Sequence, residues 1–262
     1  MGVAIAYPRT SYILMNLEIV QPETLIPTSD RHRGAISGLS WYWKKAESWY
    51  NWVFNKRSID DQWDRAKYKY NAGIWIKLRP NEMHDDESLD FCVGTYHMPC
   101  DYKRPTTMML HTITLVKMMQ DLSGNTPLIL SGDFNFGPNS PYYQTITSGS
   151  IPDDFKFQRT NDDGRISRAD QKIRAIASDL QPMKSSYFEK NGTEPLFTNY
   201  ALTEWSNQRF SGCLDYVFYL GDLQVSKVIE LPNQAPEEAF KTPLPTLDNP
   251  SDHLMIGANL YF

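Results

Sequence analysis

The sequence predicts an α/β domain in which polar residues lie at the ends of apolar strands, and three segments support this. Leu128–Phe136 is a short apolar run that ends in Gly-Asp-x-Asn, so a buried strand presents a carboxylate and an amide at its tip. Leu214–Tyr219 places an aspartate at the head of another apolar run, and Pro250–His253 places an Asp–His pair before the last one. Ligands of α/β sheets bind at strand ends, so the three segments predict one site.

The first hundred residues are predicted to form mainly strands. Strands are expected where apolar residues alternate or cluster between turn signals: Val3–Tyr7, Tyr12–Val20, Ala72–Leu78 and Asp90–Tyr96. Pro8 lies in the turn between the first two strands, and the last strand ends at His97. Apolar residues at helical spacing predict a helix over Ala35–Phe54.

A helix is expected between the strand that ends at His97 and the strand over Pro127–Leu130. Pro105 suits its first position, where no backbone N–H is needed, and Gly124 ends it. Its apolar stripe is Met109, Ile113, Val116 and Met119. Strand, helix and strand in this order place His97 and Asp133 at equivalent ends of two strands.

The C-terminal half continues the alternation of helices and strands. Ser140-Pro141 begins a short helix, and Ser167 caps a helix that carries Ile173, Ile176 and Leu180. The last three strands are expected at Leu214–Leu220, Gln224–Leu231 and Met255–Tyr261. No Gly/Ser/Pro-rich linker divides the chain, so residues 1–262 are predicted to form a single domain.

Composition narrows the classes of protein and partner. The 262 residues are 41% apolar, which is typical of a globular protein, and contain neither a run long enough for a membrane helix nor a secretory signal. A net charge of −5 argues against a protein that grips long duplex DNA, but it allows a short single strand, a nucleotide or another phosphate ester. Three cysteines suggest no disulfide framework, so we expect an intracellular, cytoplasmic protein.

The functional segments, in their order along the chain, resemble the endonuclease/exonuclease/phosphatase superfamily. Glu194–Tyr200, Phe210–Tyr216 and Pro250–His253 look most like the branch that holds the carbon-catabolite-repressor-type deadenylases and nocturnin. The resemblance spans roughly the whole chain and is densest from Thr95 onward. It implies a two-sheet α/β sandwich and a hydrolase that uses Mg²⁺ (or Mn²⁺) to cleave a phosphodiester in RNA or a nucleotide.

The resemblance also implies roles for six residues. Asp133 would orient and deprotonate the attacking water, Asn135 would hydrogen-bond the phosphate, and His97 would donate to a phosphate oxygen. The alternatives are ordinary turn chemistry for Asp133 and Asn135, and a hydrogen-bonded core position for His97. His111, in the middle of its helix, is not expected to be catalytic.

The other three residues come from the last two segments. His253 would face the scissile phosphate, Asp215 would hold the imidazole ring of His253, and Asp252 would lie at the metal. Structurally, Asp215 could instead be a simple hydrogen-bond acceptor, and Asp252 a strand cap. Phe197 and Asn199 match the loop of the deadenylase branch that contacts the nucleobase or sugar, with a core position as the alternative for Phe197.

Members of the family normally begin with a strand that carries an Asn and a strand that ends in a metal-binding Glu, and neither is found here. Met1–Pro8 resembles the strand that follows that Glu, so we expect a domain that is incomplete at its N-terminus. Asn16 and Glu18 imitate the missing spacing but lie in an alternating strand. The expected consequences are weaker Mg²⁺ binding and weak activity of this chain alone.

Three hypotheses about function follow. The first is hydrolysis of a phosphodiester in RNA or a nucleotide. The second keeps the enzyme class and changes the substrate, to a phosphomonoester such as a nucleotide cofactor or an inositol phosphate. The third is a catalytically impaired binding or scaffold module.

A tryptophan-rich insert at about residues 35–65 departs from the family pattern. It contains five of the seven tryptophans, which are Trp41, Trp43, Trp49, Trp52 and Trp63. A helix and loop packed over the sheet would explain them. Alternatively, the Trp41–Trp63 segment forms an aromatic surface for a protein partner, a membrane surface or a single strand of nucleic acid.

Overall fold

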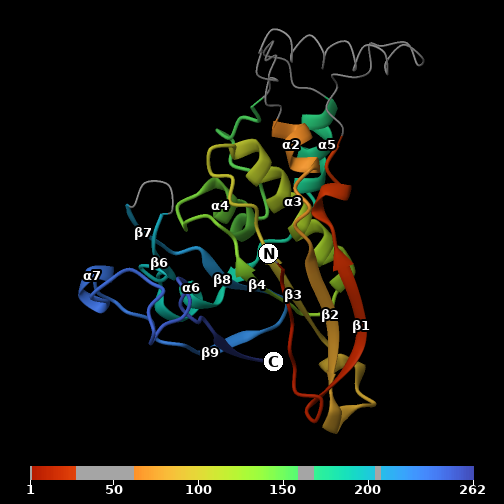
Figure 1. Cartoon of the computed structure of the whole chain (residues 1–262). Helices are drawn as coiled ribbons and strands as arrows, with labels where there is room; N and C mark the ends of the chain where they lie inside the picture. The colour runs from red at the N-terminus through yellow and green to blue at the C-terminus, as the bar shows by residue number, and fades with distance from the viewer. Residues whose placement is uncertain (1, 28–61, 159–167, 204–207) are drawn as a thin grey trace.

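A mixed six-stranded sheet forms the centre of the computed structural model, which describes residues 2–27, 62–158, 168–203 and 208–262 (Figure 1). The sheet has the strand order β1-β2-β3-β4-β8-β5. Its strands are β1 (Tyr12–Val20), β2 (Gly73–Pro80), β3 (Phe91–His97), β4 (Leu128–Asp133), β8 (Asp215–Leu220) and β5 (Lys184–Ser185). Only β3 and β4 are parallel, and the other neighbours run antiparallel.

Helix α3 (Pro105–Ser123) connects β3 to β4 and packs against β1, β2 and β4. Pro105 occupies its first turn and Gly124, with φ of 56°, forms its C-cap, as the sequence predicts. The four residues of its predicted apolar stripe are at most 1% exposed. Around α3 lie the helices α2 (Gln62–Lys67), α4 (Pro141–Ser148) and α5 (Arg168–Ala177).

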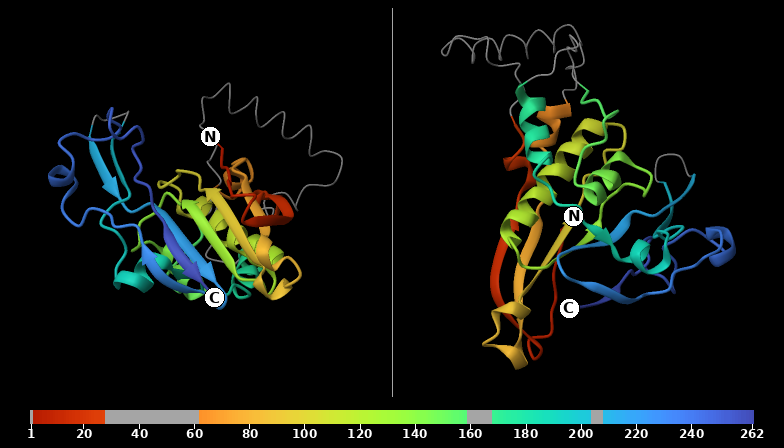
Figure 2. Two further views of the ribbon diagram at one scale, coloured as in Figure 1. Left: turned by 90° about the horizontal axis from the view of Figure 1, so that it is seen from below. Right: turned by 180° about the vertical axis from the view of Figure 1, so that it is seen from behind.

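Two small antiparallel sheets flank β8. One pairs β6 (Asn199–Leu202) with β7 (Arg209–Gly212), and the other pairs β9 (Gln224–Val228) with β10 (Ala258–Tyr261) (Figure 2). The remaining short helices are η1 (Pro22–Thr24), η3 (Asn81–Met83), η4 (Glu87–Leu89), α6 (Ser186–Asn191) and α7 (Pro236–Ala239). Among the helices described, none has the length and apolar character to cross a membrane.

Several sequence predictions are confirmed, one predicted strand is wrong and one hairpin was not predicted. The strands predicted at Tyr12–Val20 and Asp90–Tyr96 are present, and the Pro8 carbonyl accepts from two backbone N–H groups in the expected turn. Val3–Tyr7 is not a strand, because no neighbouring strand pairs with it within the described chain. The β6–β7 hairpin was not predicted, because its strands are only four residues long.

The predicted helix over Ala35–Phe54 lies outside the described residues, and so does Ser167, the proposed cap of the helix that begins at Arg168. Of the five tryptophans in the tryptophan-rich insert, only Trp63 is described. It lies on α2, is 1% exposed and packs with a ring-centroid distance of 5.4 Å against Phe157. Trp63 is therefore a core residue rather than part of an exposed aromatic surface.

His111 joins three elements in the core beneath the sheet. Its Nδ1 lies 2.9 Å from the Tyr96 hydroxyl of β3, and its Nε2 lies 2.9 Å from the Ala66 carbonyl of α2. A carbonyl oxygen can only accept, so Nε2 carries the proton and Nδ1 accepts from Tyr96. Burial lowers the pKa of His111 to about 4, and the ring is neutral in the folded protein at neutral pH.

The neutral His111 should make the fold less stable in acid. Below its ordinary pKa of about 6.5 the unfolded chain binds a proton at His111, whereas the folded chain binds it only near pH 4. The unfolded state is thus favoured as the pH falls, by about 2 kcal/mol between pH 7 and pH 5. Urea unfolding of the wild type and of His111→Gln at both pH values measures this. Between pH 7 and pH 5 the free energy of unfolding of the variant should fall by about 2 kcal/mol less than that of the wild type. An equal fall in both proteins would contradict a neutral His111 in the folded state.

Candidate active site

The tip of β4 is shaped by Gly132, which allows β4 to approach β3 closely. Its φ is 153°, and a Cβ there would lie 2.0 Å from the Tyr96 carbonyl oxygen, so no other residue fits without a backbone shift. The β3–β4 register places His97 opposite Asp133, as the sequence predicts. The backbone N–H of Met98 donates to the Asp133 carbonyl at 2.8 Å and extends this pairing past the strand ends.

Asn135 closes the turn after β4 and fixes the carboxylate of Asp133. It adopts a left-handed conformation with φ of 53°, which Asn tolerates better than most residues. Its backbone N–H donates to Asp133 Oδ1 at 2.9 Å. Its side-chain amide donates to the Met98 carbonyl at 2.8 Å and lies 3.4 Å from Asp133 Oδ2. Asn135 thus holds the orientation of the Asp133 carboxylate.

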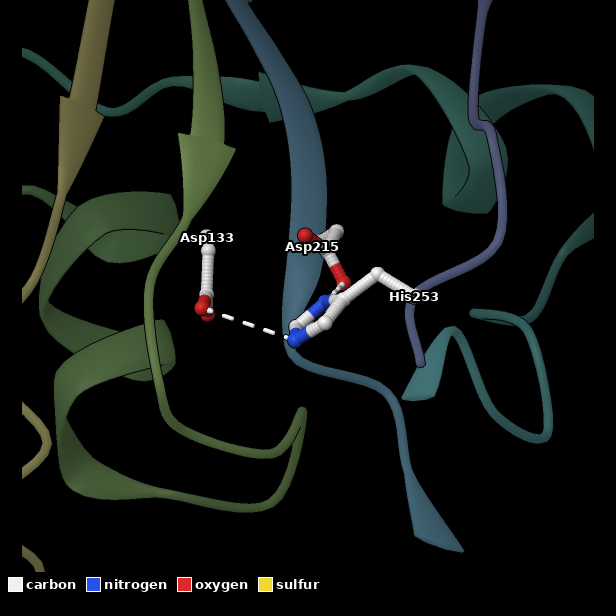
Figure 3. Close-up of side chains that lie close together, drawn as sticks. All are labelled: Asp133, Asp215 and His253. Carbon is white, nitrogen blue, oxygen red and sulfur yellow. Dashed lines mark hydrogen bonds and ion pairs between the residues drawn. The ribbon is translucent and has the colours of Figure 1, made fainter. Parts of the chain in front are cut away.

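Asp215 and His253 approach Asp133 from the neighbouring strand and from the loop before β10 (Figure 3). Asp215 is the first residue of β8 and lies opposite Asp133 in the β4–β8 register. Its Oδ2 is 2.8 Å from Nδ1 of His253. The other ring nitrogen, Nε2, lies 3.8 Å from Asp133 Oδ2, so the imidazole stands between the two carboxylates.

The backbone around His253 is held by the β6 strand. Asn199 and His253 form an isolated antiparallel bridge, and the Leu254 N–H donates to the Thr198 carbonyl at 2.7 Å. The His253 N–H donates to the Ser251 hydroxyl at 3.0 Å. His253 therefore reaches the site on a segment fixed on both sides.

Thr198 belongs to the site through a contact with Asp215 that the sequence did not reveal. Its hydroxyl donates to Asp215 Oδ2 at 2.6 Å and accepts from the backbone N–H groups of Leu214 and Asp215 at 2.9 and 3.1 Å. It is fully buried. Its place in the Phe-Thr-Asn segment was the available signal, but a threonine next to a strand rarely indicates a functional contact.

Thr198→Val should lower the turnover number without unfolding the protein. Valine has nearly the same shape but cannot donate to Asp215, so the carboxylate that orients His253 loses one hydrogen-bond donor and is held less firmly. We expect a 10- to 100-fold lower kcat, roughly the range for partners that orient active-site ligands. Thr198→Ser, which keeps the hydroxyl, is the matched control. Equal losses in both variants would show that packing rather than the hydrogen bond matters.

His97 completes the row of polar side chains at this edge of the sheet. Its Nε2 lies 3.4 Å from Asp133 Oδ2, and its own carbonyl accepts from the Asn71 side chain at 2.8 Å. The side chains of His97 and His253 are each 27% exposed, so both reach solvent beside the more buried Asp133, which is 18% exposed. The structure thus brings together the five residues predicted to be catalytic: His97, Asp133, Asn135, Asp215 and His253.

The electrostatics of the site favour binding of positive charge. Burial and the nearby charge of Asp215 raise the pKa of the Asp133 carboxyl. The hydrogen bond to Asp215 raises the pKa of His253, against the opposing effect of burial. Asp133, Asp215 and His253 each offer a donor atom, and these atoms lie within 4.8 Å of one another. Two repelling carboxylates fit a divalent cation, which would offset the repulsion.

Asp252 and the two predicted substrate-binding residues are placed differently. The Asp252 carboxylate accepts from the Asn199 side chain at 3.2 Å and is not part of the three-residue cluster. Asn199 is 4% exposed, so it positions Asp252 instead of facing solvent. Phe197 is 1% exposed and packs edge-on against Tyr200 and Phe240, so it belongs to the core and offers no free face for a base.

Solved structures share this fold. The human nocturnin catalytic domain with bound sulfate aligns with a TM-score of 0.52 and 16% identity over 97% of this chain and 61% of that one. ANGEL2, a 2',3'-cyclic phosphatase in complex with adenosine-2',3'-vanadate, aligns with a TM-score of 0.59 and 18% identity over 97% of this chain and 68% of that one. These alignments confirm the α/β fold that the sequence predicts.

Curated relatives align with about two thirds of the chain. The 2',5'-phosphodiesterase 12 of Mus musculus is 30% identical over 181 residues, which are 67% of this chain and 27% of the relative. Nocturnin of Drosophila melanogaster is 27% identical over 176 residues, 64% of this chain and 25% of the relative. The chain spans about a quarter of the length of these relatives.

The sequence profile of one family covers most of the chain. It matches residues 18–253, a range that runs from the end of β1 to the histidine beside Asp215. The relatives, which also include carbon catabolite repressor protein 4 homolog 1 of Arabidopsis thaliana, confirm the branch that the sequence motifs indicate. The chain belongs to the endonuclease/exonuclease/phosphatase family.

Proposed function

We propose that this chain carries the hydrolytic site of a divalent-metal-dependent phosphoesterase that cleaves a phosphodiester in RNA or a nucleotide. The observation that supports it most is the line of Asp133, His253 and Asp215 at the ends of β4 and β8, with one imidazole between two carboxylates. Hydrolysis of a phosphodiester needs a base for water, positive charge for the phosphate and a group that manages a proton.

The roles follow from the hydrogen bonds. Asp133, fixed by Asn135, accepts a proton from the attacking water, and its raised pKa suits a proton acceptor. His253 presents Nε2 to the phosphate while Nδ1 donates to Asp215, which keeps the ring in one tautomer and stabilises its charged form. His97 and the side-chain amide of Asn135 offer donors for non-bridging phosphate oxygens.

A Mg²⁺ or Mn²⁺ ion would supply charge neutralisation for the phosphate. Asp252, the residue before His253, would hold it. Mg²⁺ keeps several of its waters and needs only one or two carboxylates from the protein, which this site provides. Asn199 orients the Asp252 carboxylate toward that role.

The same site is compatible with two alternative functions. A phosphomonoester of a nucleotide cofactor or an inositol phosphate would meet the same donors, and a binding module would keep the fold without turnover.

Three free cysteines within the described chain support a reducing, cytoplasmic setting. We further propose that residues 1–262 act as one domain.

The test is hydrolysis on a panel made of an oligoadenylate, a mixed-sequence RNA, NADPH and inositol hexakisphosphate. Products are separated by ion-exchange chromatography, with and without EDTA and with Asp133→Asn. Turnover of the first two substrates that is lost in both controls supports the proposal. Turnover of NADPH or of the inositol phosphate alone selects the monoesterase, and no turnover of any substrate selects the binding module.

A further inference from the structure

Three tyrosines beside the active site are far more exposed than such rings usually are. Tyr68, Tyr70 and Tyr102 are 70%, 78% and 72% exposed. Tyr68 and Tyr70 follow α2, and Tyr102 lies in the loop between β3 and α3. Large apolar rings left in solvent cost free energy unless a partner covers them. We call residues 65–70 together with 101–104 the basic–tyrosine patch.

Positive charge is concentrated among these rings. The two segments contain five cations and one carboxylate, whereas the whole chain has a net charge of −5. Asp101, which is 5% exposed, holds three of the cations together: Arg65 Nε at 2.7 Å, Arg104 Nη1 at 2.9 Å and Lys69 Nζ at 3.4 Å. Lys103 lies 5.6 Å from the centre of the Tyr102 ring.

Asp101 fixes this arrangement firmly. Burial alone would raise the pKa of its carboxyl, but hydrogen bonds from Arg65 and Arg104, helped by the charge of Lys69, hold that pKa below its usual range. Asp101 is therefore ionised at neutral pH, and it ties the end of α2 to the loop before α3. The basic–tyrosine patch is thus a single surface although its segments are separate in the chain.

The patch is continuous with the active site. Asn71, the residue after Tyr70, donates to the His97 carbonyl at 2.8 Å. Met98 bridges His97 to the Asp133 turn, because its N–H donates to Asp133 and its carbonyl accepts from Asn135. Only Pro99 and Cys100 then separate Met98 from Asp101. A chain whose phosphate lies at Asp133 and His97 would meet the patch next.

We propose that the basic–tyrosine patch binds the single-stranded nucleic acid that leads away from the scissile phosphate. This rests on the proposed function and specifies its substrate as a strand of several nucleotides instead of a mononucleotide or an inositol phosphate. Cations spaced between exposed rings fit a single strand, in which phosphates and unstacked bases alternate and each base has a face for stacking. A duplex hides its base faces and would gain nothing from the tyrosines.

Binding of a fluorescein-labelled oligoadenylate of about 12 nucleotides, followed by anisotropy in EDTA, tests this without turnover. Tyr70→Ala/Tyr102→Ala removes two stacking rings and should weaken binding by roughly thirtyfold or more, and Tyr70→Phe/Tyr102→Phe should restore it because the rings remain. Lys69→Gln/Lys103→Gln should lower the slope of log affinity against log salt by about 1.4, or 0.7 for each cation. Tyr261→Ala and Lys227→Gln, on β10 and β9, are the matched controls.

The outcomes separate this proposal from the proposed function. Weaker binding by the patch variants with no turnover on the substrate panel supports the patch and overturns the hydrolase. Turnover with wild-type affinity in the patch variants overturns the patch and keeps the hydrolase. No binding of the oligoadenylate by the wild type, or equal binding of a duplex of the same length, also overturns the patch. Thermal unfolding followed by circular dichroism confirms that the variants are folded.

Discussion

Asp133→Asn should abolish most phosphodiester hydrolysis while leaving the fold as stable as the wild type or more so. Loss of a positioned base costs about a hundred- to ten-thousandfold in rate. Asparagine keeps an oxygen that accepts from the Asn135 N–H, so the turn after β4 should survive. Because burial and Asp215 disfavour the charge of Asp133, removing this charge relieves an unfavourable interaction in the folded state.

The measurements are kcat on the best panel substrate and the free energy of unfolding in urea. Asp222→Asn, at an exposed position in the turn after β8, removes the same charge away from the site and should change neither quantity. A variant that loses activity because it has unfolded would fail this expectation. Retention of more than about a tenth of the activity would show that Asp133 is not the base.

The second large effect is expected for Asp215→Asn. The carboxylate accepts from Nδ1 of His253, whereas an asparagine amide can instead donate to it and favour the wrong tautomer of the ring. We expect kcat to fall by about a hundred- to ten-thousandfold. The hydrogen bond to Asp215 is also the main cause of the raised pKa of His253, so this pKa should move down toward its ordinary value.

An NMR titration of the His253 ring protons measures the second effect independently of activity. The protonated ring is favoured below the folded-state pKa, so the variant should lose the proton at a lower pH than the wild type does. Asp248→Asn, a surface substitution, serves as the charge control. An unchanged His253 titration together with unchanged kcat would rule out an orienting role for Asp215.

The central strands and helix α3 could be predicted because each carries its own local signals. Strands β3 and β4 are apolar runs bounded by turns, and α3 has a proline at its start and a glycine at its end. Val3–Tyr7 carries the same apolar signal but has no partner strand within the described chain, so it stays irregular. Strand formation depends on a neighbour, which a local pattern does not reveal.

The part of the site that could be predicted from the sequence consists of charged residues at the ends of strands. Asp133, Asp215 and His253 stand next to apolar runs, and the structure brings them together. The role of Thr198 was missed because a threonine whose hydroxyl bonds a carboxylate looks the same in sequence as any other threonine. Phe197 was assigned to substrate because an aromatic residue beside functional residues suggests stacking, yet its surroundings in the β6–β7 hairpin bury it.

The β4–β8 pairing has a consequence for folding kinetics. Strands β3 and β4 and the helix between them are contiguous in the chain, so their contacts can form early. A long segment of chain separates β4 from β8, and this loop must close before Asp215 can lie beside Asp133. His253 lies still farther along the chain, so its loop is longer still. We therefore expect native-like secondary structure to return before hydrolysis during refolding, so that enzymatic activity reports the last step of assembly.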